Sequence, residues 1–220
     1  MAGDTSVHVE ASYVTSAGMH VTEQMGSVDD LVVALAKPVR RIRSHRGQKH
    51  RPGLFWSATT GDHVPYESWL ELDRLWLADA DPEVTWISGQ PLLLRGVHGQ
   101  KVRSHVPDFL LRRRGRPLLL VDVKPAQFAE EPRVAAVFEW TRLACQTQGW
   151  DYEVWTGAPA RALANVRALA AGRRFTEANP VRLAASNHAR MTALTRAWST
   201  GASFEEVALN WQHFEGDQPA

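Results

Sequence analysis

The sequence predicts an α/β fold in which one helix is followed by about three strands, a second helix and a last strand. Three observations indicate this order: apolar residues at helical spacing over residues 65–80, short apolar runs separated by Gly and Pro over residues 84–123, and a second helical stripe over residues 132–148. With 220 residues, 44% hydrophobic and 22% charged, the chain has the composition of a folded protein and the length of one or two domains.

The N-terminal third shows little periodicity. We expect residues 1–37 to form a tail, in which Ser27–Asp30 would cap a short helix over Leu31–Leu35. Residues 38–64 are basic and rich in Gly, Pro, Ser and Thr, so we expect an extended arm or loop there.

The first long helix is predicted to begin near Pro65, whose fixed φ suits a first helical position. It would run to about Ala80, because Asp81-Pro82 ends the pattern. Short strands separated by turn residues would follow it: Val84–Ile87, Leu92–Leu94, Val106–Leu111 and Leu118–Val123.

A turn with Gly115 at positive φ is expected between the last two of these strands. The second helix would span residues 132–148 and end at Gly149, before a strand at Tyr152–Trp155. Three further helical pieces are predicted in the C-terminal part, over residues 159–171, 181–199 and 203–213. We therefore divide the chain into a tail (1–37), a basic arm with an α/β domain (38–157) and a helical extension (158–220).

Composition excludes several classes of protein. The apolar runs, such as Leu118–Val121, are far shorter than the about 20 residues of a membrane-spanning helix. The N-terminus has neither the basic start nor the apolar stretch of a signal peptide. The single cysteine, Cys145, rules out an internal disulfide and a cysteine-rich zinc site. We therefore expect a cytoplasmic protein that does not bind a membrane.

An acid and a lysine stand at the end of the most apolar predicted strand. Side chains alternate along a strand, so Asp122 and Lys124 share one face. Burying both charges costs several kcal/mol unless they are paired or bind a metal. Asp108 precedes Asp122 by 14 residues, which leaves room for a hairpin that would bring the two carboxylates together.

Adjacent carboxylates repel each other, and a divalent cation relieves that repulsion. Carboxylate and carbonyl oxygens are the ligands that Mg²⁺ prefers. Lys124 beside such a cation could position or deprotonate an attacking water, or offset charge on a phosphate. The alternative is an Asp122–Lys124 surface pair at the end of an edge strand, which would stabilise the fold by at most about 1 kcal/mol.

The first long helix carries two glutamates on one face, Glu67 and Glu71, with Arg74 one turn beyond. One interpretation is a solvated stripe that contains a Glu71–Arg74 pair. The other is an inward glutamate that lies near the strand carboxylates.

Together these motifs resemble the restriction-endonuclease-like, PD-(D/E)xK, nuclease superfamily. Within it, the chain is most similar to the TnsA-type endonuclease subunit of heteromeric transposases. The similar segments extend over about residues 40–157 and are Tyr66–Leu72, Ile87–Pro91, Pro107–Phe109, Val121–Pro125, Glu139-Trp140 and Tyr152–Thr156. The resemblance implies a restriction-endonuclease-like core of α-β-β-β-α-β order, with a mixed sheet flanked by helices and a helical C-terminal extension.

The resemblance also implies roles for individual residues. Glu71 rather than Glu67 would be the helix carboxylate of the site, Asp108 the central metal ligand and Lys124 the catalytic lysine. Asp122 stands where the family pattern allows glutamine, and aspartate gives the more complete ligand set that is common in the wider superfamily. The expected ligands of Mg²⁺, with Mn²⁺ substituting, are Asp108, Asp122, the backbone carbonyl of Val123 and Glu71.

The implied function is a magnesium-dependent endonuclease that cuts one strand of double-stranded DNA at transposon ends. It would work beside a separate transposase subunit that cuts and joins the other strand, and the family's C-terminal domain would contact a regulatory ATPase. Two alternatives stay open. One is a stand-alone repair or restriction nuclease of the same superfamily, and the other is a non-catalytic DNA-binding or assembly module on the nuclease fold.

Basic residues are clustered although the net charge is only +1. Clustered Lys and Arg attract polyanions, so we expect phosphate contacts, with a solvated surface as the alternative. The predicted DNA-binding residues are Arg40, Arg41, Arg43, Arg46, Lys49 and Arg51 in the arm, and Arg112, Arg113, Arg114 and Arg116 in the turn. Of the nine histidines, His105 lies near Asp108 in the sequence and is either a support for that site or a plain strand residue.

Overall fold

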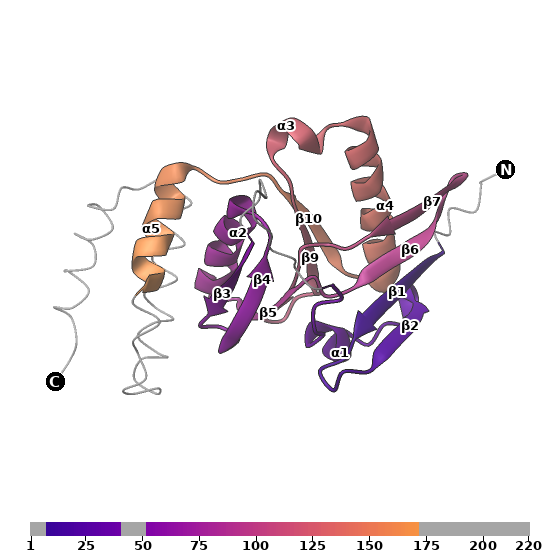
Figure 1. Ribbon diagram of the computed structural model, residues 1–220, viewed down its shortest axis with the longest axis horizontal. Coiled ribbons are helices and arrows are strands. Elements are labelled where there is room, and N and C mark those ends of the chain that lie inside the picture. Colours follow the sequence, from indigo (N-terminus) through magenta and orange to yellow (C-terminus); the bar gives the residue numbers. More distant parts are fainter. Residues whose placement is uncertain (1–7, 41–51, 172–220) are drawn as a thin grey trace.

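The computed structural model describes residues 8–40 and 52–171 (Figure 1). Within these ranges the chain forms two four-stranded sheets, a two-stranded hairpin and five α-helices, so the predicted α/β class is confirmed. None of the helices in the described ranges is long and apolar enough to cross a membrane. The predicted helices over 181–199 and 203–213, and residues 41–51 of the basic arm, lie outside the described residues.

The central sheet has the strand order β10-β9-β8-β5. Its antiparallel pairs are β5 with β8 and β8 with β9, whereas β9 and β10 are parallel, so the sheet is mixed as expected. All four strands coincide with predicted ones to within a few residues. Their bounds are β5 Val84–Gly89, β8 Phe109–Arg113, β9 Leu119–Val123 and β10 Asp151–Trp155.

Helices cover both faces of the central sheet, because its strands are apolar on both sides. Leu110 and Leu120 pack with Trp140 of α4 (Pro132–Gln148). Phe109 and Val121 face the other way and pack with Leu75 of α2 (Trp69–Ala80). The short α3 (Ala126–Ala129) follows β9, and α5 (Ala160–Ala171) follows β10 and contacts α2.

Two predicted backbone features are present. Gly115 has φ +61° in the turn between β8 and β9. Gly149 has φ +76° and ends α4, and its N–H donates to the carbonyls of Cys145 and Gln146. Glycine reaches these conformations without steric cost, which explains why both turns could be located from sequence.

In the second sheet, of order β2-β1-β6-β7, the predicted strand at Leu92–Leu94 is the start of β6, whereas the other three strands were not predicted. β1 (Val9–Val14) and β2 (His20–Gln24) form a hairpin within the expected tail, and β1 pairs with β6 (Leu93–His98), which pairs in turn with β7 (Lys101–His105). The signal in β1 is a period of two, because its buried residues Val9, Ala11 and Tyr13 alternate with polar ones.

The expected short helix is present as α1 (Asp30–Ala34), after a 3₁₀ turn at Met25–Ser27. The Asp29 side chain caps α1 by accepting from the N–H groups of Leu31 and Val32. The proposed domain boundaries at residues 37 and 157 stay predictions.

The expectation of a loop over 38–64 is corrected in its described part. β3 (Gly53–Ser57) and β4 (Asp62–Tyr66) form an antiparallel hairpin there, with Phe55 and Val64 buried against α2. Consequently Pro65 belongs to β4, and α2 begins at Trp69 instead.

Candidate active site

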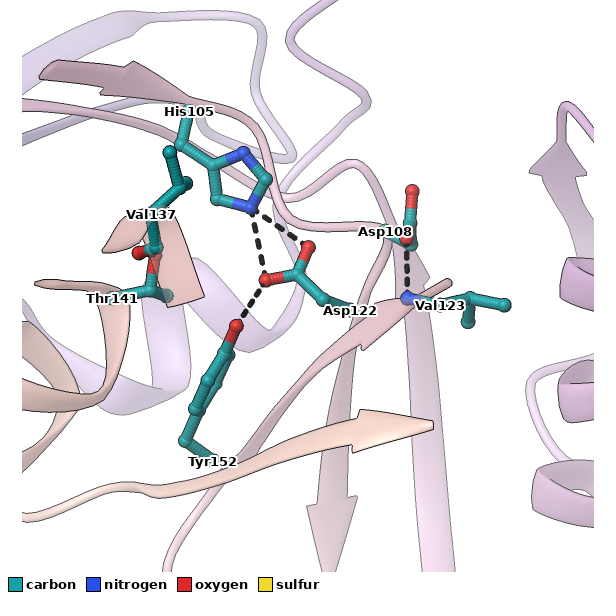
Figure 2. A network of polar contacts seen from close by, with 7 residues as sticks. All are labelled: His105, Asp108, Asp122, Val123, Val137, Thr141 and Tyr152. Carbon is teal, nitrogen blue, oxygen red and sulfur yellow. Dashed lines mark hydrogen bonds and ion pairs between the residues drawn. The ribbon is translucent and has the colours of Figure 1, made fainter. Parts of the chain in front are cut away.

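The predicted site residues Asp108 and Lys124 lie at one end of the central sheet, because Asp108 precedes β8 and Lys124 follows the antiparallel β9. Asp108 is tied to the end of β9 in two ways. Its backbone N–H donates to the Val121 carbonyl at 3.0 Å, and its Oδ2 accepts from the Val123 N–H at 2.7 Å (Figure 2). The structure therefore brings Asp108 beside the strand that carries Asp122.

Glu71 lies in the first turn of α2 and is only 8% exposed. Its backbone N–H donates to Ser68 Oγ at 3.1 Å, and Ser68 Oγ donates back to Glu71 Oε1 at 2.8 Å. Glu71 Oε2 accepts from the Glu67 N–H at 2.7 Å. This reciprocal capping orders the start of α2 and fixes the carboxylate of Glu71.

The second interpretation of the helix glutamates agrees with these contacts. Glu71 is buried, whereas Glu67 forms a more exposed ion pair with Arg40 at 2.8 Å. Arg74 bonds to Glu153 at 2.7 Å rather than to Glu71. The solvated stripe with a Glu71–Arg74 pair is therefore not formed.

The charges of Glu71 and Asp122 affect the pKa of Asp108. Burial raises the pKa of Asp108 well above its usual value, and the charges of Glu71 and Asp122 raise it further. The Val123 N–H and the Arg40 guanidinium oppose this rise in the pKa. Burial also raises the pKa of Glu71. Asp108 is therefore subject to the negative charges of two other carboxylates, which the positive charge of Arg40 partly offsets.

Asp122 has different surroundings and is only 1% exposed. Its two carboxylate oxygens lie 2.8 and 2.9 Å from His105 Nε2, and Oδ2 accepts from the Tyr152 hydroxyl at 2.5 Å (Figure 2). The Asp122 side chain therefore has hydrogen-bond partners on two other strands, β7 and β10. Burial and the Asp122 carboxylate raise the pKa of Tyr152.

His105 and Tyr152 are the polar residues that the sequence analysis did not assign to the site. His105 ends β7, which was not predicted, and Tyr152 begins the strand that runs parallel to β9. Of the two interpretations given for His105, support of the site agrees with its position, although it contacts Asp122 rather than Asp108.

Gln90 is a further residue that the sequence did not single out. Its N–H donates to the Asp108 carbonyl at 2.7 Å, and its φ of +49° is unusual for a residue with a side chain. The side-chain amide of Gln90 is buried, and neither its nitrogen nor its oxygen has a hydrogen-bond partner among the described residues. Such strain at a non-glycine residue is typical of functional sites.

Lys124 is partly exposed, and its backbone N–H donates to the Trp155 carbonyl at 2.9 Å. Among the described residues, Asp122 pairs with His105 and not with Lys124. The alternative of an Asp122–Lys124 surface pair therefore does not describe this site. The ammonium group of Lys124 thus has no ion pair with the acid two residues before it.

Asp108 is subject to the negative charges of Glu71 and Asp122, and carboxylate oxygens are the ligands that a hard cation prefers. In the described part of the chain, however, no group of three or more His, Cys, Asp and Glu side chains is arranged to hold a metal ion. Glu71 and Asp122 are instead turned toward their own hydrogen-bond donors.

The predicted DNA-binding residues fall into three groups. Arg40 is near the acids, since its charge lowers the pKa of both Glu71 and Asp108. The turn with Arg112, Arg113, Arg114 and Arg116 follows β8 and is therefore at the opposite end of the central sheet from Asp108. Arg113 bonds there to the Asp151 carboxylate and to the Pro117 carbonyl. The other arm residues lie outside the described residues: Arg41, Arg43, Arg46, Lys49 and Arg51.

Residues 81–157 match the family model of the TnsA-like endonuclease N-terminal domain. The matched segment includes Asp108, Asp122 and Lys124 but not α2 with Glu71. No curated protein matches the chain significantly. The match supports a TnsA-like nuclease family and suggests a nuclease related to transposition.

Proposed function

We propose that the protein is a magnesium-dependent DNA endonuclease that cleaves one strand at transposon ends as a subunit of a heteromeric transposase. The single observation that carries the proposal is that Asp108 is subject to the charges of Glu71 and Asp122, with Asp108, Asp122 and Lys124 inside the segment that matches a TnsA-like endonuclease. Its partners would be double-stranded DNA, a separate transposase subunit that acts on the other strand, and a regulatory ATPase.

The residues proposed to hold Mg²⁺, or Mn²⁺ in its place, are Asp108, Asp122 and the carbonyl of Val123, with Glu71 completing the site directly or through water. A cation bound there would lower the pKa of an attacking water and stabilise the leaving oxygen of the phosphodiester. The contact of Asp108 with the Val123 N–H and the capping of Glu71 by Ser68 support the proposal, because ligand carboxylates are usually oriented by hydrogen bonds.

Lys124 would contribute to catalysis rather than to the stability of the fold. Its ammonium group would position or deprotonate the water, or offset the charge that develops on the phosphate. Arg40 and the other basic residues of the arm and of the Arg112–Arg116 turn would bind phosphates, which orients DNA without reading its sequence. Sequence choice would then rest largely with the partner subunit.

The test is cleavage of double-stranded DNA by variants of the full chain in Mg²⁺ or Mn²⁺, with and without the product of a neighbouring transposase gene. Asp108→Ala and Lys124→Ala should each abolish cleavage and keep a cooperative thermal transition. Arg161→Ala, at an exposed position of α5, is the control and should cut like the unmodified protein. Full activity in either site variant contradicts the mechanism. Strong cutting without a partner would favour the stand-alone nuclease.

A second candidate, a DNA-binding module with an idle site, is favoured by the lack of a preformed group of three metal-binding side chains in the described residues. It requires that Mg²⁺ and Mn²⁺ leave the melting temperature unchanged while DNA binding stays sensitive to salt. A rise in the melting temperature with either cation excludes this candidate.

A further inference from the structure

β6 and β7 form a hairpin in the second sheet. Its end, from Val97 to Val102, extends beyond the pairing of β6 with β1 and forms a two-stranded ribbon (Figure 1). The register of the hairpin runs from Leu94 opposite His105 to His98 opposite Lys101. Gly99 takes the first of the two loop positions with φ +62°, where a type II′ turn requires glycine. The hairpin is therefore a regular β-ribbon with a tight end rather than an irregular loop.

The ribbon is positively charged. Residues 91–107 contain Arg95, Lys101 and Arg103 and no Asp or Glu. Arg95 and Lys101 are exposed, and Arg103 is partly exposed. The nearest acid in the sheet register is Glu10 of β1, opposite Arg95, so the part of the ribbon beyond Gly96 has no acidic cross-strand neighbour.

The end of the ribbon also exposes an apolar pair. Val97 and Val102 face each other across the two strands and are 53% and 83% exposed. Apolar side chains on an isolated ribbon gain nothing from the core, and they are the kind of side chain that contacts bases and sugars inside a DNA groove. A two-stranded β-ribbon has the width that the major groove admits.

The ribbon leads directly into the proposed active site. His105 at the end of β7 contacts Asp122, and Asp108 follows three residues later. Lys101 lies seven residues before Asp108, so the chain between them spans at most about 25 Å. That span is shorter than one turn of B-DNA, about 34 Å. The Arg112–Arg116 turn, in contrast, is at the far end of the sheet from Asp108.

We infer that the β6–β7 ribbon binds duplex DNA beside the cleaved phosphodiester. Lys101 would contact a phosphate, and the Val97–Val102 pair would lie in a groove. The inference rests on the proposed function for its choice of substrate. Positive charge, exposed valines and the connection to Asp108 favour DNA over a protein strand that would pair with the edge of β7.

The test is DNA binding by the full chain, measured by fluorescence anisotropy of a labelled duplex over a series of salt concentrations without divalent cations. Lys101→Gln should lower the slope of log affinity against log salt by about 0.9, the effect of one lost phosphate contact. Arg161→Gln removes the same charge from an exposed position on α5 and should leave the slope unchanged. Val102→Thr keeps a β-branched shape and should weaken binding several-fold with no change in slope.

A Lys101→Gln slope equal to that of the unmodified protein overturns the inference. So does a ribbon variant that binds DNA normally but no longer binds the transposase subunit, because the ribbon would then be a protein-binding edge. The proposed function is judged separately by cleavage in Mg²⁺. A chain that binds DNA through the ribbon and never cuts it would end the nuclease proposal and keep the ribbon.

Discussion

Asp108 and Asp122 lie at the same end of the central sheet, on neighbouring strands, yet their surroundings differ. Asp122 is nearly inaccessible to solvent and accepts from two side-chain donors, His105 and Tyr152. Asp108 accepts from one backbone N–H and faces the charges of Glu71 and Asp122. Asp108 is also less buried than Asp122, so the two carboxylates differ both in exposure and in their partners.

This difference in hydrogen-bond partners indicates different roles for Asp108 and Asp122. A buried carboxylate that accepts several hydrogen bonds is held in one orientation, which suits a group that must keep its place. A carboxylate that is repelled by its neighbours is unfavourable alone and becomes favourable when a cation arrives. We therefore expect Asp122 to contribute mainly to positioning and stability, and Asp108 to respond most strongly to Mg²⁺.

The largest expected effect is on stabilisation by the cation. At about 100 times its dissociation constant, Mg²⁺ should stabilise the protein by about 2.7 kcal/mol. In a protein of this size that corresponds to a rise in melting temperature of about 5–10 °C. Asp108→Asn should remove most of this rise, because it removes the charge that attracts the ion. Differential scanning calorimetry without DNA measures the effect.

Glu139→Gln is the control for this comparison, since Glu139 is an exposed acid on α4 that pairs with Arg142. It should keep the full rise in melting temperature. If Asp108→Asn also keeps it, Asp108 is not a ligand of the cation and the contrast between the two acids does not concern metal binding.

The next effect concerns the donors of Asp122. Tyr152→Phe removes a hydrogen bond to a buried carboxylate and should lower the free energy of unfolding by about 1.5–3 kcal/mol. Because the orientation of a proposed ligand is lost, cleavage should fall by roughly 10–100-fold. Urea unfolding and a cleavage assay measure the two losses.

Tyr13→Phe is the matched variant, since the Tyr13 hydroxyl donates to Glu23 at 2.6 Å in the second sheet, between β1 and β2. It should lower stability and leave cleavage unchanged. Equal loss of cleavage in both variants would mean that Tyr152 acts only through general stability.

The sequence allowed the central sheet, α4 and the α/β class to be predicted, because these elements have apolar runs bounded by Gly and Pro. It did not reveal β7, whose charged and exposed residues are typical of a loop and which is held as a strand by pairing with β6. The β3–β4 hairpin was missed for a similar reason, since Gly, Pro, Ser and Thr dominate its segment.

The site, like the fold, was predicted only in part from the sequence. The spacing of Asp108 and Asp122 indicated a hairpin, and the antiparallel pairing of β8 and β9 agrees with it. The contact of Tyr152 with Asp122 could not be derived, because it depends on the parallel pairing of β9 and β10 after the crossover through α4. No local sequence pattern indicates which strands become neighbours through such a crossover.

The last expected effect is on the pH dependence of stability without divalent cations. An aspartate in an unfolded chain loses its proton near pH 4, whereas Asp108 in the folded protein has a raised pKa and keeps its proton to higher pH. Between these two values the folded state binds more protons, so the free energy of unfolding falls as the pH rises, by about 1.4 kcal/mol for each unit of difference in pKa. Asp108→Asn should make this decline shallower, and Glu139→Gln should not. Urea unfolding at one-unit steps from pH 4 to pH 8 measures it. An unchanged decline in Asp108→Asn would show that the burial of Asp108 and its repulsion by Glu71 and Asp122 are not what opposes folding there.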